Sequence, residues 1–332
     1  MTPLLEVSDL EVRFDTPDGI VHAVNGVSFS VGKGETLAVV GESGSGKSVT
    51  MLALLRLLAE PPARIVGGRA VFDSSSGPIS LLDLAPRALR RIRGRDIGYV
   101  AQDPMTSLNP TVTVETQLVE TIRAHLPESR RSARRRAIEL LGHVGIPDPA
   151  RRVGDYPHQF SGGMRQRVMI AIAISCGPRL IIADEPTTAL DVTVQAQIVE
   201  LMASLRGELD LSLIWITHDL GVVAGLADRV AVMYGGRIIE SAPVRELYAR
   251  PLHPYTIGLL GALPRVGERR TRLTAIPGAP PDLTARPGEC AFSPRCTHAF
   301  DLCASTLPPL TEPTTGRFLA CFHDVESGVA RD

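Results

Sequence analysis

The sequence predicts an α/β fold with a parallel sheet, followed by a small C-terminal extension that carries four of the five cysteines. Short apolar runs typical of buried strands alternate with amphipathic helical stretches. A glycine-rich loop stands between one such run and a helix, and a second run ends in two carboxylates. At 332 residues, with 44% hydrophobic and 21% charged content, the chain has room for one large globular domain and a smaller unit.

The first functional motif is a loop with the spacing G-x-x-x-x-G-K-[ST], namely Gly41-Glu42-Ser43-Gly44-Ser45-Gly46-Lys47-Ser48. It follows a β-type run at residues 36–40 and precedes a predicted helix at 49–58. Glycines let backbone N–H groups turn toward phosphates, and a helix N-terminus adds partial positive charge. We therefore expect Gly41 to Val49 to bind a nucleoside triphosphate, with Lys47 neutralising phosphate charge and the Ser48 hydroxyl on Mg²⁺.

The second motif is the apolar run at residues 180–183, which ends in Asp184 and Glu185. A buried parallel strand would deliver these acids to the carboxyl edge of the sheet, where ligands of α/β folds bind. We expect Asp184 to reach Mg²⁺ through water and Glu185 to polarise the water that attacks the γ-phosphate. The alternative is an ordinary strand that ends in an acidic turn.

The third motif lies between these two and reads Phe160-Ser161-Gly162-Gly163-Met164-Arg165-Gln166-Arg167. Ser161 is a predicted helix cap, and the glycines permit a phosphate to approach backbone N–H groups. The segment resembles the signature motif of ATP-binding-cassette proteins, whose commonest form is Leu-Ser-Gly-Gly-Gln; Phe160 and Met164 depart from it. In that family Ser161, Gly162 and Gly163 would contact the γ-phosphate held by another subunit, so the resemblance implies a dimer.

Four further positions fit the same family. Gln102 resembles the glutamine that joins the Mg²⁺ shell and senses the γ-phosphate, and Asp191 resembles the aspartate that crosses the dimer interface. His218 resembles the switch histidine, whose neutral imidazole could donate one hydrogen bond to the γ-phosphate. Phe14, in a strand-like segment upstream of the loop, is the predicted adenine-stacking residue; a place in the core is the alternative.

The resemblance implies a RecA-like core with an antiparallel β-subdomain and a helical subdomain. Residues 1–102 would form the first part of the core, 103–160 the helical subdomain, 161–240 the second part of the core, and 241–332 the extension. Strands are expected at residues 10–14, 27–31, 37–40, 69–72, 97–100, 180–183, 212–217 and 230–233, and helices in the helical subdomain at 114–124 and 132–144.

An arginine-rich run, Arg130-Arg131-Ser132-Ala133-Arg134-Arg135-Arg136, lies in the second of these helices. Its continuation into Ala137-Ile138-Glu139-Leu140-Leu141 makes the run one polar face of an amphipathic helix. A docking surface and a nucleic-acid contact are the alternatives. No aromatic residues interleave with the arginines to stack bases, and the net charge of −1 gives no reason to expect nucleic acid as a partner.

The C-terminal extension is proline-rich, and its segment His253-Pro254-Tyr255-Thr256 resembles the tail of ATP-binding subunits of oligopeptide, dipeptide and nickel importers. Its thiols, Cys290, Cys296, Cys303 and Cys321, suit a metal site better than disulfides in a cytosolic protein. The pattern from Cys290 to Cys296 is similar to that of peptide-importer ATPases with a [4Fe–4S] cluster, so we expect such a cluster. Zinc and unligated thiols remain alternatives; Cys176 is expected in the core.

The resemblance thus implies an ATP-hydrolysing subunit of a peptide importer, driven by ATP-dependent dimer closure. It would act with two transmembrane permease subunits, with a second ATPase subunit that is a paralogue, and indirectly with an extracytoplasmic solute-binding protein. Import of nickel or another small solute, export, and a non-transport role in DNA repair or translation are the alternatives. No run of 18 apolar residues and no signal-peptide pattern occurs, so we expect peripheral attachment to the cytoplasmic face of the cell membrane.

Overall fold

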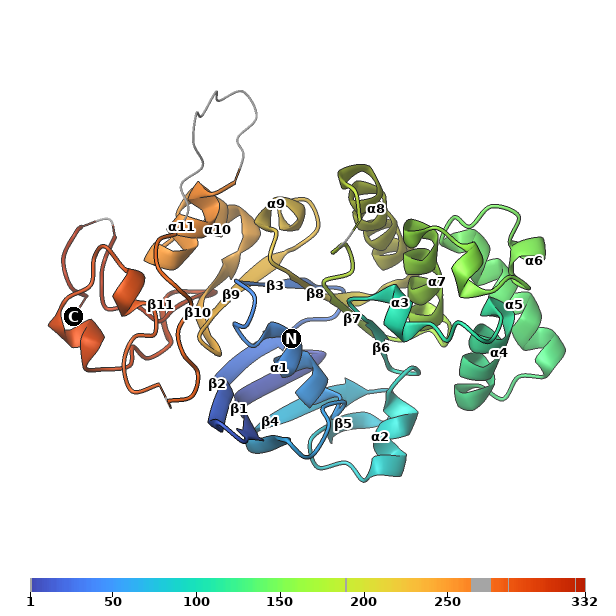
Figure 1. Ribbon diagram of the computed structural model, residues 1–332, viewed down its shortest axis with the longest axis horizontal. Coiled ribbons are helices and arrows are strands. Elements are labelled where there is room, and N and C mark those ends of the chain that lie inside the picture. The colour runs from blue at the N-terminus through green and yellow to red at the C-terminus, as the bar shows by residue number, and fades with distance from the viewer. Residues whose placement is uncertain (1, 189, 264–275, 286, 326, 332) are drawn as a thin grey trace. The chain divides into compact units, whose positions relative to one another are not determined.

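The computed structural model describes residues 2–331 apart from 189, 264–275, 286 and 326. The chain forms two compact units (Figure 1). Unit 1 comprises Met1–Val31, Thr36–Leu82 and Thr217–Asp332, and unit 2 comprises Gly32–Glu35 and Asp83–Ile216. None of the helices in the described part of the chain has the length and apolarity that a membrane span requires.

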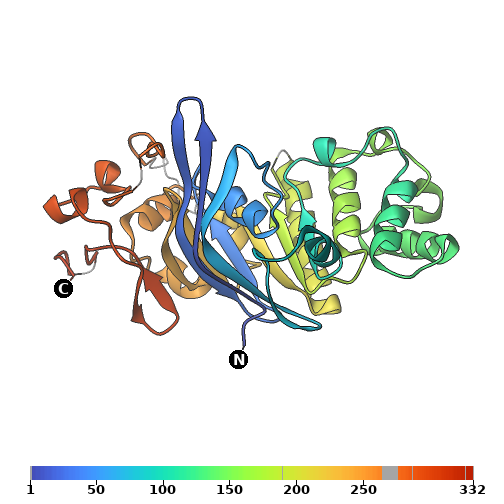
Figure 2. The same ribbon diagram turned by 90° about the horizontal axis from the view of Figure 1, so that it is seen from below.

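An antiparallel sheet opens unit 1, and Figure 2 shows its long first hairpin in dark blue. The strands run in the order β2-β1-β4-β5 and span Gly19–Val31, Leu5–Thr16, Ala63–Ser74 and Gly77–Ser80. Strands β1, β2 and β4 are much longer than predicted. A register shift between Val7 and Leu10 breaks the two-residue alternation of β1, so the sequence pattern indicated only part of this strand. Asp9, with φ 50°, lies within this irregularity, which lets Val7 and Leu10 both face the core.

The second sheet of unit 1 carries the predicted phosphate loop. Its strands lie in the order β11-β12-β10-β9-β3 and span Thr311–Thr314, Arg317–Leu319, Arg237–Pro243, Arg229–Tyr234 and Thr36–Val40. Strands β3 and β9 are parallel, and the others pair antiparallel. The C-terminal extension therefore adds β11 and β12 to this sheet, where the sequence predicted no strands.

Helices α9 (Leu220–Val223), α10 (Val244–Ala249) and α11 (Pro254–Gly261) of unit 1 pack on this second sheet. Helix α1 (Lys47–Leu54) contacts β1 and β2 of the antiparallel sheet. Short 3₁₀ turns lie at Ser293–Arg295 and Asp301–Ala304. Val40, Val232, Leu247 and Tyr255 belong to one buried core cluster. Helix α1 starts two residues before and ends four before the predicted bounds, because Arg56 takes a left-handed conformation with φ 47° that a helix cannot continue.

Unit 2 contains parallel strands and a group of helices. The strands are β6 (Ile97–Val100), β7 (Leu180–Asp184) and β8 (Ser212–Thr217), with β7 between the other two. The helices are α2 (Pro86–Ile92), α3 (Pro104–Ser107), α4 (Val114–His125), α5 (Arg130–His143), α6 (Pro149–Arg152), α7 (Gly162–Ile174) and α8 (Val192–Leu209), with a 3₁₀ turn at Pro157–Gln159.

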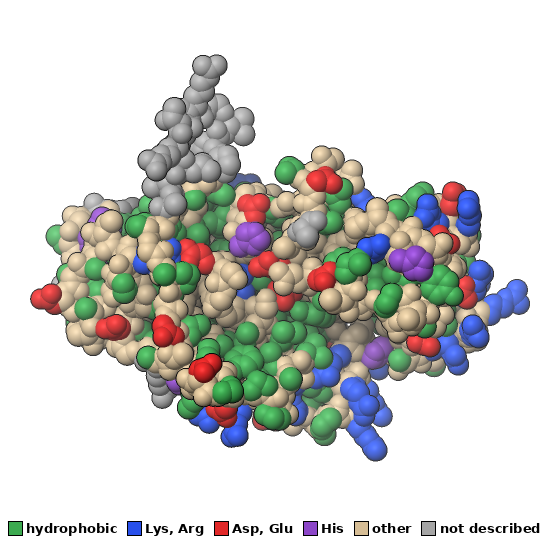
Figure 3. Space-filling model, viewed as in Figure 1, with side chains coloured by type: hydrophobic (Ala, Val, Ile, Leu, Met, Phe, Trp, Pro, Cys, Tyr) green, Lys and Arg blue, Asp and Glu red, His purple; other side chains and the backbone are tan. Residues whose placement is uncertain are grey.

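The arginine run forms the outer face of α5, as predicted. Ala133, Ala137 and Leu141 are fully buried on the inner face, whereas Arg130, Arg131, Arg134 and Arg135 are exposed. In Figure 3 basic side chains gather over the α4 to α6 part of unit 2. Arg134 donates from Nε to Glu115 Oε2 on α4 at 2.8 Å, so part of this charge serves helix–helix packing.

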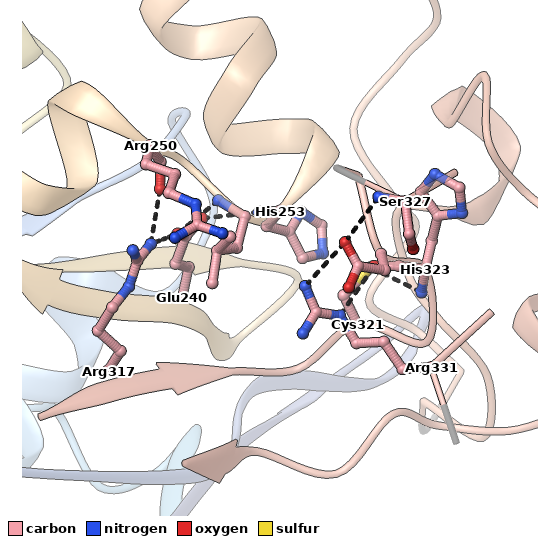
Figure 4. A network of polar contacts seen from close by, with 10 residues as sticks. Glu240, Arg250, His253, Arg317, Cys321, His323, Ser327 and Arg331 are labelled. Atoms are coloured by element: carbon pink, nitrogen blue, oxygen red, sulfur yellow. Dashed lines mark hydrogen bonds and ion pairs between the residues drawn. The ribbon is translucent and has the colours of Figure 1, made fainter. Parts of the chain in front are cut away.

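A buried ion pair joins the extension to the second sheet of unit 1 (Figure 4). Glu240, 1% exposed, accepts a hydrogen bond from Arg317 Nη2 at 3.3 Å. It also accepts from the backbone N–H groups of Leu252 at 2.8 Å and His253 at 2.9 Å. Both carboxylate oxygens are thus satisfied, which makes this buried charge tolerable. His253 in turn caps α11, its Nδ1 accepting from Tyr255 N at 3.0 Å.

Burial lowers the pKa of His253 to about 3, so the folded protein holds a neutral ring that the unfolded chain protonates below about pH 6.5. The unfolded state then binds more protons between pH 6.5 and 3, and stability falls as the pH falls through that window. Relative to His253→Asn, which can cap the helix but does not titrate, we expect the wild type to lose about 2 kcal/mol between pH 7 and 5. Urea unfolding of both proteins at the two pH values measures this; equal pH dependence would contradict it.

Candidate nucleotide-binding site

The glycine-rich loop of unit 1 connects β3 to α1, the strand–loop–helix context that the motif requires. Two of its glycines are sterically obligatory. A Cβ on Gly41 would lie 2.2 Å from Met233 O, and one on Gly46 would lie 2.4 Å from Ala23 O. Lys47, 4% exposed, folds back so that Nζ donates to Gly41 O at 2.8 Å and Glu42 O at 2.9 Å. The ammonium therefore lies inside the ring of the loop.

The N-terminus of α1 has no side-chain cap. Gly46 occupies the cap position with φ 96° and has no side chain that could cap the helix. Thr50 Oγ1 instead turns back and donates to Gly46 O at 2.8 Å. N–H groups of a first turn without a cap, together with the nearby Lys47 ammonium, form an anion-binding arrangement. Ser48 is half-buried in this turn.

The other two predicted residues of unit 1 lie outside the loop. Phe14 is half-buried on β1, where it pairs with Val21 on β2 and Ala63 on β4. It is therefore not a fully buried core residue. His218 is exposed and follows β8. The residues on either side of it in the sequence are held by hydrogen bonds. Thr217 Oγ1 accepts from Asp219 N at 3.0 Å, and the Asp219 side chain caps α9.

The two carboxylates of unit 2 differ sharply in environment. Asp184, 3% exposed, ends β7 and accepts a hydrogen bond on Oδ2 from the Tyr99 hydroxyl at 3.0 Å. Burial and the negative charge of Asp184 raise the pKa of Tyr99, which keeps the hydroxyl a donor. Glu185 is only half-buried. The strand thus delivers one fixed carboxylate and one that has access to solvent.

Glu185 is held in a strained backbone conformation. Its φ is 44°, a left-handed value that costs a non-glycine residue about 1–3 kcal/mol and is concentrated at functional sites. Its N–H donates to Ile216 O at 3.0 Å, and its Oε2 accepts from Gln102 Nε2 at 3.2 Å and from Thr188 Oγ1 at 2.9 Å. The predicted glutamine and the predicted catalytic acid are therefore in direct contact.

The signature segment and Asp191 begin two adjacent helices. Ser161 caps α7 and accepts from Met164 N at 3.4 Å, while Asp191 caps α8 and accepts from Val194 N at 3.0 Å. A Cβ on Gly163 would meet Val194 Cγ1 at 2.6 Å, so α8 packs too closely for any other residue there. Ser161, Gly162 and Asp191 are exposed. Unit 2 thus presents two helix N-termini side by side.

Sequence reasoning missed two residues of this site. Tyr99 and Thr188 fix Asp184 and Glu185, respectively. Both stand inside segments that had been singled out for other residues. The signal that could have identified Tyr99 is a tyrosine in an otherwise apolar strand. Because β6 and β7 are parallel neighbours, a tyrosine hydroxyl on β6 can reach the carboxylate at the end of β7.

The structure does not support the predicted [4Fe–4S] cluster or the zinc alternative. Among the residues it describes, no three His, Cys, Asp or Glu side chains are grouped as metal ligands. Burial raises the pKa of the thiols of Cys290, Cys296 and Cys321. Cys176 is a buried residue, as predicted.

The loop, the carboxylate strand and the signature helix are the parts of an ATP-hydrolysing cassette, and comparison with known proteins agrees. The model of the ABC transporter family matches residues 24–188, and that of the oligopeptide/dipeptide transporter C-terminal region matches residues 239–303. Among solved structures, a dimeric ATP-binding cassette in a post-hydrolysis state, bound to ADP and Pi, superposes with a TM-score of 0.64 at 27% identity. It covers 73% of this chain and 99% of that one.

Relatives of similar length indicate to which group of this family the chain belongs. The oligopeptide transport ATP-binding protein OppD of Bacillus subtilis is 51% identical over 311 residues, 93% of this chain and 86% of its own. The dipeptide transport ATP-binding protein DppD of the same organism is 48% identical over 339 residues, which cover both chains completely. The chain therefore belongs to the ABC transporter family, in the group of oligopeptide and dipeptide transport ATP-binding proteins.

Proposed function

We propose that this protein is the ATP-hydrolysing subunit of an importer that carries peptides across the cytoplasmic membrane. The observation that carries the proposal is the identity of about half over more than nine-tenths of the chain with oligopeptide and dipeptide transport ATP-binding proteins. The matched C-terminal region points the same way. The phosphate-loop geometry and the contacts of Glu185 supply the chemistry that such a subunit needs.

In unit 1 the proposed task is to bind the triphosphate. The N–H groups at the start of α1 and the Lys47 ammonium would surround the β- and γ-phosphates, with Gly41 to Val49 as the binding segment. Phe14 would stack on the adenine, and His218 would contact the γ-phosphate. An imidazole exposed at the end of a strand can donate one hydrogen bond while it remains neutral.

In unit 2 the proposed task is hydrolysis. Glu185 would orient and polarise the attacking water, because its carboxylate is accessible and already aligned by Gln102 and Thr188. Phosphoryl transfer of this kind needs positioning and charge neutralisation and no covalent intermediate. The hydrogen bond from Gln102 to Glu185 offers a direct route by which a change at the γ-phosphate would reach the catalytic carboxylate.

Three of the predicted residues carry oxygen atoms of the kind that Mg²⁺ binds. Ser48, Gln102 and Asp184 offer a hydroxyl, an amide and a carboxylate oxygen, the hard ligands that this ion prefers. Gln102 uses its Nε2 to bind Glu185, which leaves Oε1 of the same amide as the ligand atom. The ion would neutralise phosphate charge during transfer.

The signature end of α7 and Asp191 would serve a second ATPase subunit. Both are exposed helix starts on one side of unit 2, suited to a γ-phosphate and an interface held by another molecule. We infer that this second subunit is a paralogue, and that two membrane permeases dock on the helical segment 103–160. The protein would then act at the cytoplasmic face of the membrane, with a solute-binding protein on the far side.

Uptake assays in a strain of the source organism that lacks this gene test the proposal. We expect the strain to lose uptake of labelled di- to pentapeptides and to keep uptake of ⁶³Ni²⁺, with peptide uptake restored by the wild-type gene and not by Glu185→Gln. Loss of nickel uptake with normal peptide uptake would favour the alternative of a metal importer. Normal uptake of both would contradict the proposal.

A further inference from the structure

The C-terminal extension reaches the phosphate loop at one residue, Glu42, within unit 1. Arg295 Nη1 donates to Glu42 Oε2 at 2.8 Å and Nη2 donates to Oε1 at 3.1 Å, a two-point contact between residues 253 positions apart. The Tyr255 hydroxyl of α11 accepts from Glu42 N at 2.9 Å. Both the side chain and the backbone of this loop residue are therefore held by the part of the chain that follows the ATPase core.

The Arg295 side chain is buried and held by several contacts, unlike an ion pair on the exposed surface. Its side chain is 5% exposed, and all five of its N–H donors are used. Besides the two bonds to Glu42, Nε donates to Pro277 O at 2.8 Å, Nη1 to Tyr234 Oη at 3.2 Å and Nη2 to Ile276 O at 3.3 Å. The guanidinium also lies over the rings of Tyr234 and Phe292.

The surrounding extension is shaped for this guanidinium. Phe292 is 4% exposed and packs edge-on against Tyr234 and Tyr255, with ring centroids 5.3 and 5.4 Å away. Gly278, with φ 79°, brings the backbone so close that a Cβ there would lie 3.1 Å from Arg295 Cγ. These contacts, together with the hydrogen bonds to Pro277 O and Ile276 O, hold Arg295 in one conformation next to the loop.

The carboxylate that Arg295 contacts belongs to the loop predicted to receive a triphosphate. Glu42 also provides, through its carbonyl oxygen, an acceptor for the Lys47 ammonium. Its side chain is 27% exposed, so without a partner it would present a negative charge next to a polyanionic ligand. Arg295 neutralises that charge and holds the residue on which Lys47 rests.

We propose that Arg295 is a positioning residue of the nucleotide site, through which the C-terminal extension sets the affinity for ATP. The inference rests on the proposed role of the phosphate loop. A merely structural link between extension and core would make Arg295 important for stability alone. The present geometry requires in addition that loss of Arg295 acts on nucleotide binding through the charge of Glu42.

Nucleotide affinity of the full-length chain tests the proposal. For Arg295→Met we expect the Kd for Mg·ATP, measured with a fluorescent analogue and by competition with ATP, to rise about tenfold, a usual size for coupling between two parts of a protein. ATPase assays should show the change in KM, with kcat changed less. Adding Glu42→Gln to Arg295→Met removes the uncompensated charge and should recover most of the affinity.

Arg317→Met is the matched control, because it removes another buried arginine of the same extension, whose side chain contacts Glu240 and Arg250 O rather than Glu42 (Figure 4). Its Kd should stay near the wild-type value even where its melting temperature falls. Equal weakening by Arg317→Met, no weakening in folded Arg295→Met, or no recovery in the double variant would each overturn the proposal.

Two further measurements of Mg·ATP affinity complete the test. Should Arg295→Met not fold, Tyr255→Phe keeps the ring and removes only the acceptor of Glu42 N, and it should weaken Mg·ATP binding about threefold; unchanged affinity would then overturn the inference. Wild-type protein that binds no Mg·ATP at all would instead refute the proposed function, and the two failures are therefore distinguishable.

Discussion

Glu185→Gln should abolish steady-state ATP hydrolysis while Mg·ATP still binds. The change keeps the size of the side chain and an oxygen that can accept from Gln102 or Thr188, but it removes the negative charge that polarises water. Loss of a general base lowers turnover by about 100-fold or more. Phosphate release assays on the purified protein, with its paralogue where the pair is needed, measure the rate. Equilibrium binding of a fluorescent ATP analogue checks that affinity is retained.

The same variant should accumulate a closed dimer. With cleavage blocked, each triphosphate stays between one phosphate loop and the opposing signature segment, so size-exclusion chromatography with Mg·ATP should show a dimer that ADP does not produce. Glu200→Gln, an exposed Glu-to-Gln change on α8, is the control and should behave as wild type. Hydrolysis at the wild-type rate in Glu185→Gln would remove this residue from the mechanism.

The parts of the site that the sequence predicted are those with local causes. Gly46 has a φ of 96°, a left-handed value that glycine adopts readily, and the neighbouring apolar run has a strand's composition. Ser161 caps the helix that follows it, as predicted and as its residue type favours. Motif spacing encodes such features directly, because each depends on residues a few positions away.

Contacts between distant segments were not predictable in this way. The bond between Arg295 and Glu42 joins residues that no local pattern relates, since the pattern from Cys290 to Cys296 that contains Arg295 indicates no partner for it. Strand β12 likewise joins β10 through a pairing of Glu240 with Leu319 that a proline-rich composition conceals. In both cases tertiary packing decides the structure, and single-sequence patterns carry no information about the partner.

The cysteines show what residue spacing leaves open. A metal site requires thiolates that converge on one point at fixed distances. Cys290 N donates to Cys303 O at 3.0 Å, which brings these two residues together. Among the residues that the structure describes, however, no three His, Cys, Asp or Glu side chains are grouped as metal ligands. Spacing along the chain does not fix the directions of the side chains.

Lys47→Ala should lose the binding of Mg·ATP itself, whereas Glu185→Gln should keep the binding and lose hydrolysis. Lys47 is the cation at the centre of the loop, held between Gly41 O and Glu42 O in a site that is 4% exposed. Removing it withdraws one positive charge from the place of a triphosphate, where low solvent access strengthens charge interactions. We expect the Kd for Mg·ATP to rise at least about 100-fold, equivalent to about 3 kcal/mol, and no dimer to form with nucleotide.

Lys33→Ala is the natural control, because Lys33 is the only other lysine of the chain and is exposed. It should bind Mg·ATP as the wild type does, whereas similar weakening in both variants would point to nonspecific charge effects. The size of the loss should also exceed that of Arg295→Met, since Lys47 would contact phosphate directly and Arg295 acts through Glu42. The opposite ranking would mean that the loop binds nucleotide chiefly through its backbone N–H groups and the start of α1, with the ammonium in a structural role.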